Sequence, residues 1–473
     1  MRVSNVILLI AVFVSNGRSA LAADPHSLSP EAAADEVRQV VSLVLEHHPD
    51  PFAVTSRADF EQRAAELLDR RAPISIGQQY FDLSSLLGLV ADTHTQLHTM
   101  PDTPGFERTY PLRFKVFEDG LYIIAGDEHY RDIIGSRIVS IGGIPADEAL
   151  ERLADAAIGE HALRRRVFAE NYLYVPESYA AVGLARKDGS VWLEIETSAG
   201  YRRRVELDHT WDRRWDEFGW ETLNPFLPAE LITVHDVFGT EPPFYLQHID
   251  DNYWFTFLDG ERYMYLQVNL PFPKEDGEAP MDYHLRWIQA LRNSDVEVLI
   301  IDLRNNPGGS INLTEPIVGL LAQQYFVHPT LNGVAVLIST DTVSAGSVLA
   351  ARLEGAIRPV FIGTPTGSAP NLVLEPREEI LPHSGFQVSV SREQYIATRE
   401  SDIRRAVYPD LYWKNTFDDY ANGRDKALEL ARTVDKDLRA KVYAGTSVYT
   451  PWLRPSQRDG GAVDLTSAAI DSP

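Results

Sequence analysis

The sequence contains no cysteine in its 473 residues. This absence excludes a disulfide framework, a thiol nucleophile and cysteine lipidation. Lysine is missing from one long stretch, since none occurs between Lys274 and Lys414. After the first 22 residues no apolar run has the length of a membrane span. Internal repeats and low-complexity tracts are also absent from the sequence.

Positive charge is scarce, because 44 basic residues stand against 68 acidic ones and the formal net charge is -24. An acidic surface of this size disfavours nucleic acid and anionic membranes as partners. Two basic clusters interrupt it, at residues 164–166 and 202–204. We interpret both clusters as solvated faces.

The first 22 residues have the pattern of a secretory signal peptide. Arg2 precedes an apolar stretch at residues 6–14, and Ala20-Leu21-Ala22 matches a cleavage motif. A membrane anchor is the alternative, but the apolar stretch is too short to span a bilayer. We therefore expect an exported protein, periplasmic or extracellular, whose mature chain has no membrane span and relies on core burial.

The rest of the chain divides by pattern into four parts. Helical periodicity predicts an amino-terminal helical domain, and short strands with glycine turns predict a small β-rich module. A core with buried strands and a carboxyl-terminal tail follow. The four parts are residues 24–100, 104–210, 225–432 and 433–473.

Adjacent His47 and His48 end the first predicted helix, just before two prolines. Two neighbouring histidines can indicate a metal site, but no acid or third histidine stands at ligand spacing. We therefore favour a structural role for this pair, and the sequence implies neither a metal nor a cofactor.

Three short apolar runs organise residues 296–371. They are rich in β-branched residues, are bounded by turn residues, and cover residues 296–303, 334–338 and 360–363. Two helical patterns separate them, so the predicted unit is βαβαβ, an α/β fold with a mostly parallel sheet. Ligands of such sheets bind at the carboxyl ends of the strands, where the loops 304–309 and 339–346 begin.

Ser344 stands at the start of the helix that follows the second of these loops. The amides at a helix start and the helix dipole favour negative charge, as an oxyanion formed by serine attack on a carbonyl requires. The amide of Ala345, and that of Gly308 or Gly309 on the neighbouring loop, are the candidate donors. Ser344 could equally be an ordinary helix cap, and spacing alone does not decide between the two roles.

Four stretches together resemble the tail-specific, or C-terminal processing, serine peptidase family. The sequence from Asp302 to Gly309 resembles its glycine loop, and Ser344-Ala345-Gly346 its nucleophile motif. Residues 407–410 resemble its closing Pro-Asp motif, and residues 135–143 resemble its PDZ-like module. The resemblance spans about residues 36–432 and implies a crotonase/ClpP-like peptidase core.

One departure from the family pattern concerns the catalytic base that accepts the proton of the serine. Most members of the family that this chain resembles use a lysine, and the corresponding turn here reads Gly367-Ser368-Ala369-Pro370-Asn371. A branch that resembles the tricorn protease core uses a histidine instead, and His94 in Asp92-Thr93-His94-Thr95 matches that residue.

The resemblance assigns the remaining site residues as well. Thr93 corresponds to a neighbouring hydroxyl, Ser368 has a supporting position, and Asp402 or Glu400 would orient the imidazole. Asp302 and Arg304 are expected to hold the glycine loop. A structural role for His94 is the alternative to catalysis.

These assignments imply an exported serine peptidase that cleaves peptides or protein C-terminal segments through an acyl-enzyme on Ser344. The missing lysine keeps a second interpretation open, namely a catalytically degenerate peptidase fold that binds a peptide or a small apolar ligand. A structural or interaction protein of the envelope is a third. The sequence leaves the oligomeric state open.

Overall fold

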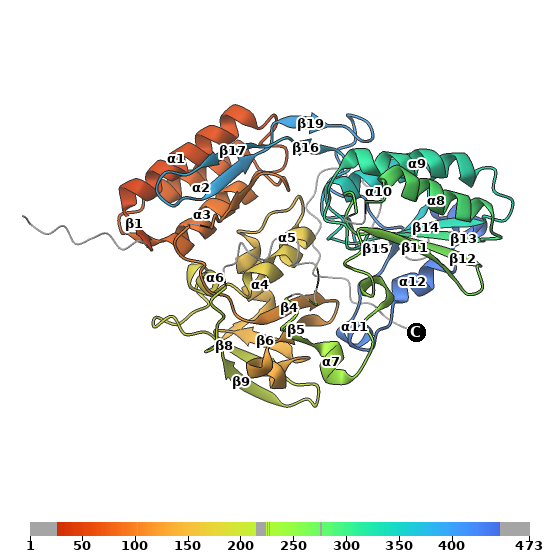
Figure 1. Ribbon diagram of the computed structural model, residues 1–473. Helices are drawn as coiled ribbons and strands as arrows, with labels where there is room; N and C mark the ends of the chain where they lie inside the picture. The colour runs from red at the N-terminus through yellow and green to blue at the C-terminus, as the bar shows by residue number, and fades with distance from the viewer. Residues whose placement is uncertain are drawn as a thin grey trace, which may run out of the picture.

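The computed structural model describes residues 26–101, 103–213, 224, 226, 228–274 and 277–444. The expected signal peptide at residues 1–22 and most of the expected tail lie outside these ranges. Among the described helices, none is both long enough and apolar enough to cross a membrane. The architecture is mixed α/β, as the sequence predicts (Figure 1).

A six-stranded sheet forms the centre of the carboxyl-terminal half. Its strands are, in spatial order, β11 (Tyr253–Leu258), β12 (Tyr263–Val268), β13 (Val298–Asp302), β14 (Gly333–Ile338), β15 (Val360–Gly363) and β20 (Leu411–Tyr412). β11 runs antiparallel to β12, and all other neighbours are parallel. α9 (Ile311–Tyr325) and α10 (Ala345–Ile357) connect β13 to β14 and β14 to β15. The predicted βαβαβ unit is confirmed.

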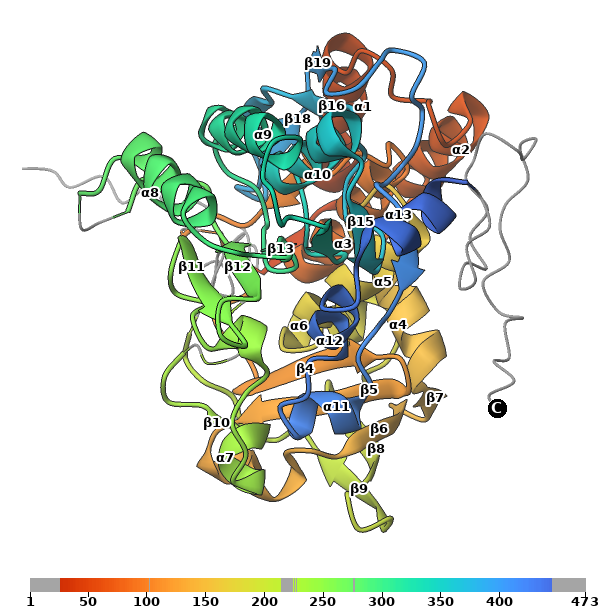
Figure 2. The same cartoon turned by 90° about the vertical axis from the view of Figure 1, so that its right-hand side faces the viewer.

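Helices cover both faces of this sheet (Figure 2). α8 (Pro280–Arg292), α9 and α10 pack on one face, and α12 (Lys426–Ala431) packs on the other. Side chains of β13 alternate between the faces, with Leu299 and Ile301 on the first and Val298 and Ile300 on the second. Burying each such side chain stabilises the fold by roughly 1.5–3 kcal/mol. The sheet is therefore a rigid support for the loops at its carboxyl edge.

A seven-stranded antiparallel sheet lies next to this core. Its strands are β4 (Leu112–Phe117), β5 (Gly120–Gly126), β6 (Arg137–Ile141), β7 (Ile144–Pro145), β8 (Trp192–Glu196), β9 (Arg202–Glu206) and β10 (Ile232–Thr233). β4 and β5 form a hairpin at the Asp119-Gly120 turn, where Gly120 has φ 139°. The helical elements that accompany this sheet are η1 (Glu128–Ile133), α4 (Ala146–Ala154), α5 (Ala162–Phe168), η2 (Ala169–Tyr172), α6 (Pro176–Ala181), α7 (Val234–Phe238) and η5 (Phe244–Leu246).

Three amino-terminal helices lie beside the β-rich sheet, namely α1 (Pro30–His47), α2 (Arg57–Leu68) and α3 (Ile76–Gly88). The start of α1 is capped, because the Ser29 hydroxyl accepts a hydrogen bond from the Ala32 amide at 3.2 Å and Pro30 occupies the first turn. A short ladder of β1 (Ser27–Leu28) and β2 (Ile74–Ser75) joins the start of α1 to the start of α3. The three helices and the β-rich sheet share one hydrophobic core.

A second small sheet joins the amino-terminal helices to the chain that leaves the central sheet. β3 (Gln96–His98) pairs with β18 (Gln387–Val390), and β18 pairs with β17 (Arg377–Ile380), which lies against α1 in Figure 1. β16 (Leu372–Leu374) and β19 (Glu393–Tyr395) form a separate ladder nearby. The β3–β18 pairing ties the segment just after His94 to the chain that follows the central sheet.

The carboxyl-terminal segment contains α11 (Phe417–Ala421), α12 and α13 (Lys436–Tyr443). α13 falls inside the stretch expected to be a tail, and the side chain of Asp435 caps its first turn. The Arg439 side chain donates to the carbonyls of Ile357 and Arg358, which end α10. The ordered chain therefore extends past residue 432 because these polar contacts dock α13 on the core.

Candidate active site

Ser344 occupies the turn between β14 and α10. Its backbone has φ 52° and ψ -121°, a conformation that costs a non-glycine residue roughly 1–3 kcal/mol. Its side chain makes no capping hydrogen bond to the helix. Ser344 therefore occupies the N-cap position of α10 without acting as its side-chain cap.

The hydroxyl of Ser344 meets an imidazole from the amino-terminal helical part. Oγ of Ser344 lies 3.0 Å from Nε2 of His94, although the two residues are 250 positions apart. The His94 side chain is 21% exposed, so a substrate can reach it. Two contacts fix the segment: the His94 amide donates to Asp92, and β3 pairs with β18 two residues later.

The other imidazole nitrogen points toward a buried carboxylate. Nδ1 of His94 lies 3.8 Å from Oδ1 of Asp92 and has no hydrogen-bond partner among the described residues. Asp92 also accepts a hydrogen bond from Thr95 at 2.7 Å and lies 3.5 Å from Nε2 of His48. Burial alone would raise the pKa of Asp92, but the nearby imidazoles of His48 and His94 outweigh burial and hold the pKa below its ordinary range. Asp92 is therefore a stable negative charge behind the imidazole.

Asp402 and Glu400, the acids expected to orient the imidazole, are placed elsewhere. The Asp402 carboxylate accepts hydrogen bonds from Arg404, at 2.7 Å, and from Thr398, at 3.0 Å. Glu400 is exposed. The expectation is corrected because Arg404 also pairs with Glu354 of α10 and draws this loop onto the helix.

His48, which with His47 raised the question of a metal, lies on the far side of Asp92. Its Nδ1 accepts a hydrogen bond from the Asp50 amide at 3.2 Å, a contact that ends α1. The described part of the chain contains no group of three or more side chains arranged to hold a metal ion. His48 thus supports the Asp92 carboxylate.

The glycine loop is anchored below the site by a buried arginine. Arg304 pairs with Asp302 at the end of β13 and with Asp425, at 2.8 Å, at the start of α12. Its guanidinium lies 4.2 Å from the centre of the Tyr245 ring. Asp302 and Arg304 thus make the contacts expected of residues that hold the loop.

Gly308 and Gly309 have φ of 115° and 144°, which glycine adopts readily. A methyl group on Gly308 would lie 2.6 Å from the Ser344 Cβ, so the loop packs directly against the hydroxyl-bearing turn. The Gly308 amide donates to the side chain of Asn306 at 3.0 Å. The amides of Gly309 and Ala345 have no such partner among the described residues. Of the three candidate oxyanion donors, these two are available.

The turn that would carry the family lysine contains a hydroxyl in contact with the Ser344 backbone. Oγ of Ser368 accepts a hydrogen bond from the Ser344 amide at 2.7 Å and donates to Ser347 at 3.1 Å. Ser368 is fully buried. It therefore supports the strained turn from behind.

Sequence reasoning missed a buried acid on the opposite side of Thr93. Thr93 donates a hydrogen bond to Glu160 at 3.2 Å, and the other carboxylate oxygen accepts from the Ala369 amide. Burial, followed by the charge of Asp92, raises the pKa of Glu160 to about 8. Glu160 follows a glycine in an irregular segment, far along the chain from the glycine loop and from Ser344. No local sequence pattern therefore indicates a role for it.

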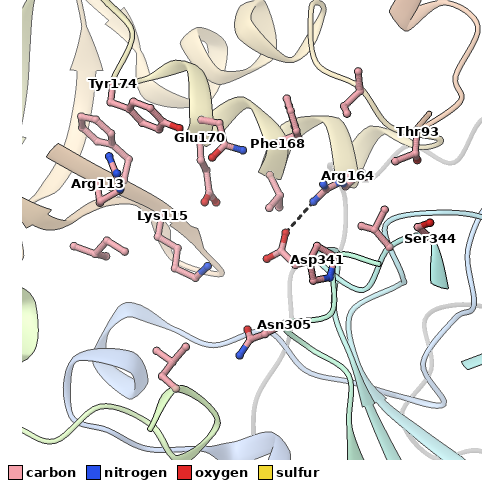
Figure 3. Close-up of a pocket in the computed structure, with 18 of the residues that line it drawn as sticks. Thr93, Arg113, Lys115, Arg164, Phe168, Glu170, Tyr174, Asn305, Asp341 and Ser344 are labelled. Atoms are coloured by element: carbon pink, nitrogen blue, oxygen red, sulfur yellow. Dashed lines mark hydrogen bonds and ion pairs between the residues drawn. The ribbon is translucent and has the colours of Figure 1, made fainter. Parts of the chain in front are cut away.

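A cavity of about 440 Å³ opens beside Ser344 and His94 (Figure 3). Its walls come from β4, the α5–η2 segment, the glycine loop and the loop that precedes Ser344. Apolar side chains such as Phe114 and Phe168 alternate with charged ones. The hydroxyl–imidazole pair thus faces a space that can hold several atoms of a substrate.

Comparison with known proteins identifies the fold. Mature CPAF superposes with a TM-score of 0.59 at 14% identity, over 89% of this chain and 99% of that one. The CPAF S499A mutant gives a TM-score of 0.61 at 15% identity, over 87% and 98% of the two chains. The chain has a CPAF-like fold. The resemblance to tail-specific peptidases is thereby confirmed at the level of the fold.

A third structure, mature CPAF complexed with lactacystin, matches with a TM-score of 0.59 at 15% identity, over 88% of this chain and 99% of that one. No protein-family model matches the sequence. A search of curated proteins gives no match either. The fold is therefore identified by structural comparison, because the sequence identity to these structures is low.

Proposed function

We propose that this protein is an exported serine peptidase that cleaves peptides or protein C-terminal segments through an acyl-enzyme on Ser344. The 3.0 Å contact between the Ser344 hydroxyl and His94 carries the proposal, because a serine needs a base to become a nucleophile. The strained turn and the CPAF-like fold support it.

In the proposed reaction Nε2 of His94 accepts the hydroxyl proton as Oγ attacks the peptide carbonyl carbon. The carbonyl oxygen becomes an oxyanion, and the amides of Gly309 and Ala345 donate hydrogen bonds to it. The imidazolium then gives its proton to the leaving amine as the carbon–nitrogen bond breaks. Water attacks the ester by the same route and regenerates Ser344.

Asp92 is proposed to stabilise the imidazolium that forms during each step. The separation of 3.8 Å between Nδ1 and Oδ1 is longer than a hydrogen bond, and such contacts can shorten once substrate binds. The charge of Asp92 favours the protonated ring at either distance. Thr93 and Glu160 would hold this segment against the Ser368 turn.

The remaining family features belong to the same proposal. Residues 104–210 would form a PDZ-like module, residues 225–432 a crotonase/ClpP-like core, and residues 24–100 an amino-terminal helical domain. The substrate would enter as an extended strand beside the β-rich sheet. Export rests on the pattern of residues 1–22.

The test is cleavage by purified wild-type and Ser344→Ala proteins, compared with Ser389→Ala, which changes a buried serine of β18 outside the site. Cleavage of a casein or peptide mixture that vanishes only in Ser344→Ala supports the peptidase. Because mature CPAF was solved in a complex with lactacystin, this compound is a suitable ligand to test for binding to the wild-type and Ser344→Ala proteins.

A binding protein on the same fold is the second candidate, favoured by the lysine-free turn at residues 367–371. It predicts that ligands occupy the cavity while Ser344 stays unreactive. Equal and negligible cleavage by wild-type and Ser344→Ala proteins would favour it over the peptidase.

A further inference from the structure

β11 (Tyr253–Leu258) is an edge strand of the six-stranded central sheet, and in the described part of the chain it pairs with β12 alone. Outside that ladder, the described backbone of residues 254–258 has one further contact, in which the Thr256 hydroxyl donates to the Phe257 carbonyl at 3.4 Å. Figure 2 shows β11 at the outer margin of the sheet. Amide and carbonyl groups on this edge are therefore available to a further strand.

The composition of β11 is unusual for an exposed edge. Residues 253–258 contain no charged residue and no proline, and residues 254–258 are partly exposed. Proteins commonly protect an exposed edge with charged side chains, with proline or by keeping the strand short. β11 has none of these features, although 24% of the whole chain is charged. Its sequence therefore does not oppose pairing with another strand.

The other sheet edges among the described strands are protected. β9 and β17 carry charge, at residues 202–204 and 377–379. β1, β2, β7, β10 and β20 have two residues each, and β16 and β19 have three each. β3 packs against α3, and β4 packs against η2, where Glu170 accepts a hydrogen bond from the Val116 amide. Among these edges, β11 is thus the one suited to pairing.

Side-chain contacts hold β11 in place from both faces of the sheet. Nε1 of Trp254 donates to Oε1 of Gln267 on β12 at 3.1 Å, and the ring centres of Trp254 and Phe244 are 5.6 Å apart. On the other face, the ring centres of Phe255 and Tyr283 of α8 are 6.0 Å apart. The edge is ordered before a partner arrives, so pairing costs little conformational entropy.

We propose that two copies of this chain pair through β11 and join their central sheets antiparallel across a two-fold axis. The contact is closed and yields a dimer, because an antiparallel pair of identical strands uses the same edge of both copies. With Tyr253 opposite Leu258 of the second copy, Trp254 faces Phe257, and Phe255 faces Thr256. Aromatic pairs and aromatic pairs with β-branched residues stabilise a sheet. The inference is independent of the proposed peptidase, because β11 contributes no residue to the cavity beside Ser344.

The charge distribution fits a second copy of the chain as the partner. Two molecules that each carry a formal charge of -24 repel one another, so a stable contact between them needs a surface without acids. β11 provides such a surface, since no like charges meet when the strand faces itself. Asp251 and Asp259 lie close to its two ends, and a shift of the register by two residues would place one of them beside Leu258 or Trp254. These acids therefore favour the register given above.

Analytical ultracentrifugation of the purified protein measures the association. The full sequence has a mass of 53.0 kDa, and we expect a species of twice the monomer mass to become dominant between about 1 and 100 μM, as suits a small interface. About 0.5 M salt should leave the dimer intact or strengthen it, because the paired strands carry no charge. A monomer throughout this range, or dissociation by salt, would overturn the inference.

Variants of Thr256 locate the interface. Thr256→Lys places a charge in the middle of the edge, and we expect it to weaken dimerisation roughly tenfold or more. Thr256→Val keeps a β-branched side chain and should preserve the dimer. Gln394→Lys is the matched control, because it adds the same charge at an exposed position of β19. A Thr256→Lys protein that dimerises with the wild-type Kd would contradict pairing through β11.

Amide hydrogen exchange of the wild-type protein tests the same contact without a substitution. Exchange at residues 253–258 should slow as the protein concentration rises into the dimer range, because the edge amides acquire hydrogen bonds. Residues 377–380, in the charged edge strand β17, are the internal reference and should exchange at a constant rate. A dimer whose β11 amides exchange at the monomer rate would show that the copies meet elsewhere, and the proposal would fail.

Discussion

The hydroxyl of Ser368 accepts a hydrogen bond from the backbone amide of Ser344 at 2.7 Å. The turn that would carry the family lysine therefore contributes a backbone contact in this chain. The imidazole in contact with the Ser344 hydroxyl is that of His94, which enters from the amino-terminal helical part and is the base in the proposed mechanism. In the proposed mechanism, Ser368 therefore holds the backbone of Ser344, and His94 deprotonates its hydroxyl.

Ser368→Ala tests the holding role. It leaves the buried Ser344 amide without a partner, at a cost of about 1–3 kcal/mol, and relaxes the strained turn. We expect a drop in kcat of roughly tenfold or more with little change in KM. Ser178→Ala is the matched control, because it removes a buried hydroxyl of α6 that donates to the backbone carbonyls of Tyr172 and Val175. Equal kcat for the two variants would contradict this role.

Gly308→Ala tests the close approach of the glycine loop. Its methyl group would lie 2.6 Å from Cβ and 3.2 Å from Oγ of Ser344, on a backbone with φ 115°. We expect destabilisation of about 1–3 kcal/mol and a loss of activity on the order of 10²-fold. Gly319→Ala in α9 is the control, since a methyl group on Gly319 would have nothing within 4 Å and alanine favours helices. A fully active Gly308→Ala protein would contradict the close packing of the glycine loop against Ser344.

Glu160 predicts a specific pH dependence of stability. Its folded pKa of about 8 lies above its ordinary value of 4.5, so the folded state binds more protons between these two pH values. The stability that it contributes is complete below pH 4.5 and is lost as pH rises through 8. Each pKa unit between the folded and unfolded values corresponds to roughly 1.4 kcal/mol of unfolding free energy.

The measurement is denaturant unfolding of wild-type and Glu160→Gln proteins at pH 5.5, 7 and 8.5, about the range of that change. Gln mimics the neutral acid at every pH. The unfolding free energy of Glu160→Gln should therefore increase relative to that of wild type as pH rises. Glu393→Gln, at an exposed position in β19, should show no such trend. Parallel pH profiles for wild-type and Glu160→Gln proteins would count against the raised pKa.

The parts that could be predicted from the sequence are local in the chain. β-branched runs gave the strands of the central sheet, and the glycine loop and Ser344 followed because parallel strands bring their carboxyl ends together. Asp302 and Arg304 lie two residues apart, so their pairing is also a local property.

The parts that could not be predicted depend on distant packing. Glu160 meets Thr93 across 67 positions and Ala369 across 209, and no spacing rule records such contacts. Asp92 was visible next to His94, but only the fold shows that it, and not Asp402, lies near Nδ1. The docking of α13 depends likewise on carbonyls at the end of α10.

The most direct test of the account is the rate at which a fluorophosphonate probe labels the hydroxyl of Ser344. Labelling forms a phosphorus–oxygen bond, releases fluoride and needs the same base as peptide attack. We predict that His94→Ala labels about 10²- to 10⁴-fold more slowly than wild type, and that Ser344→Ala does not label. Labelling of His94→Ala at the wild-type rate would contradict the assignment of His94 as the base.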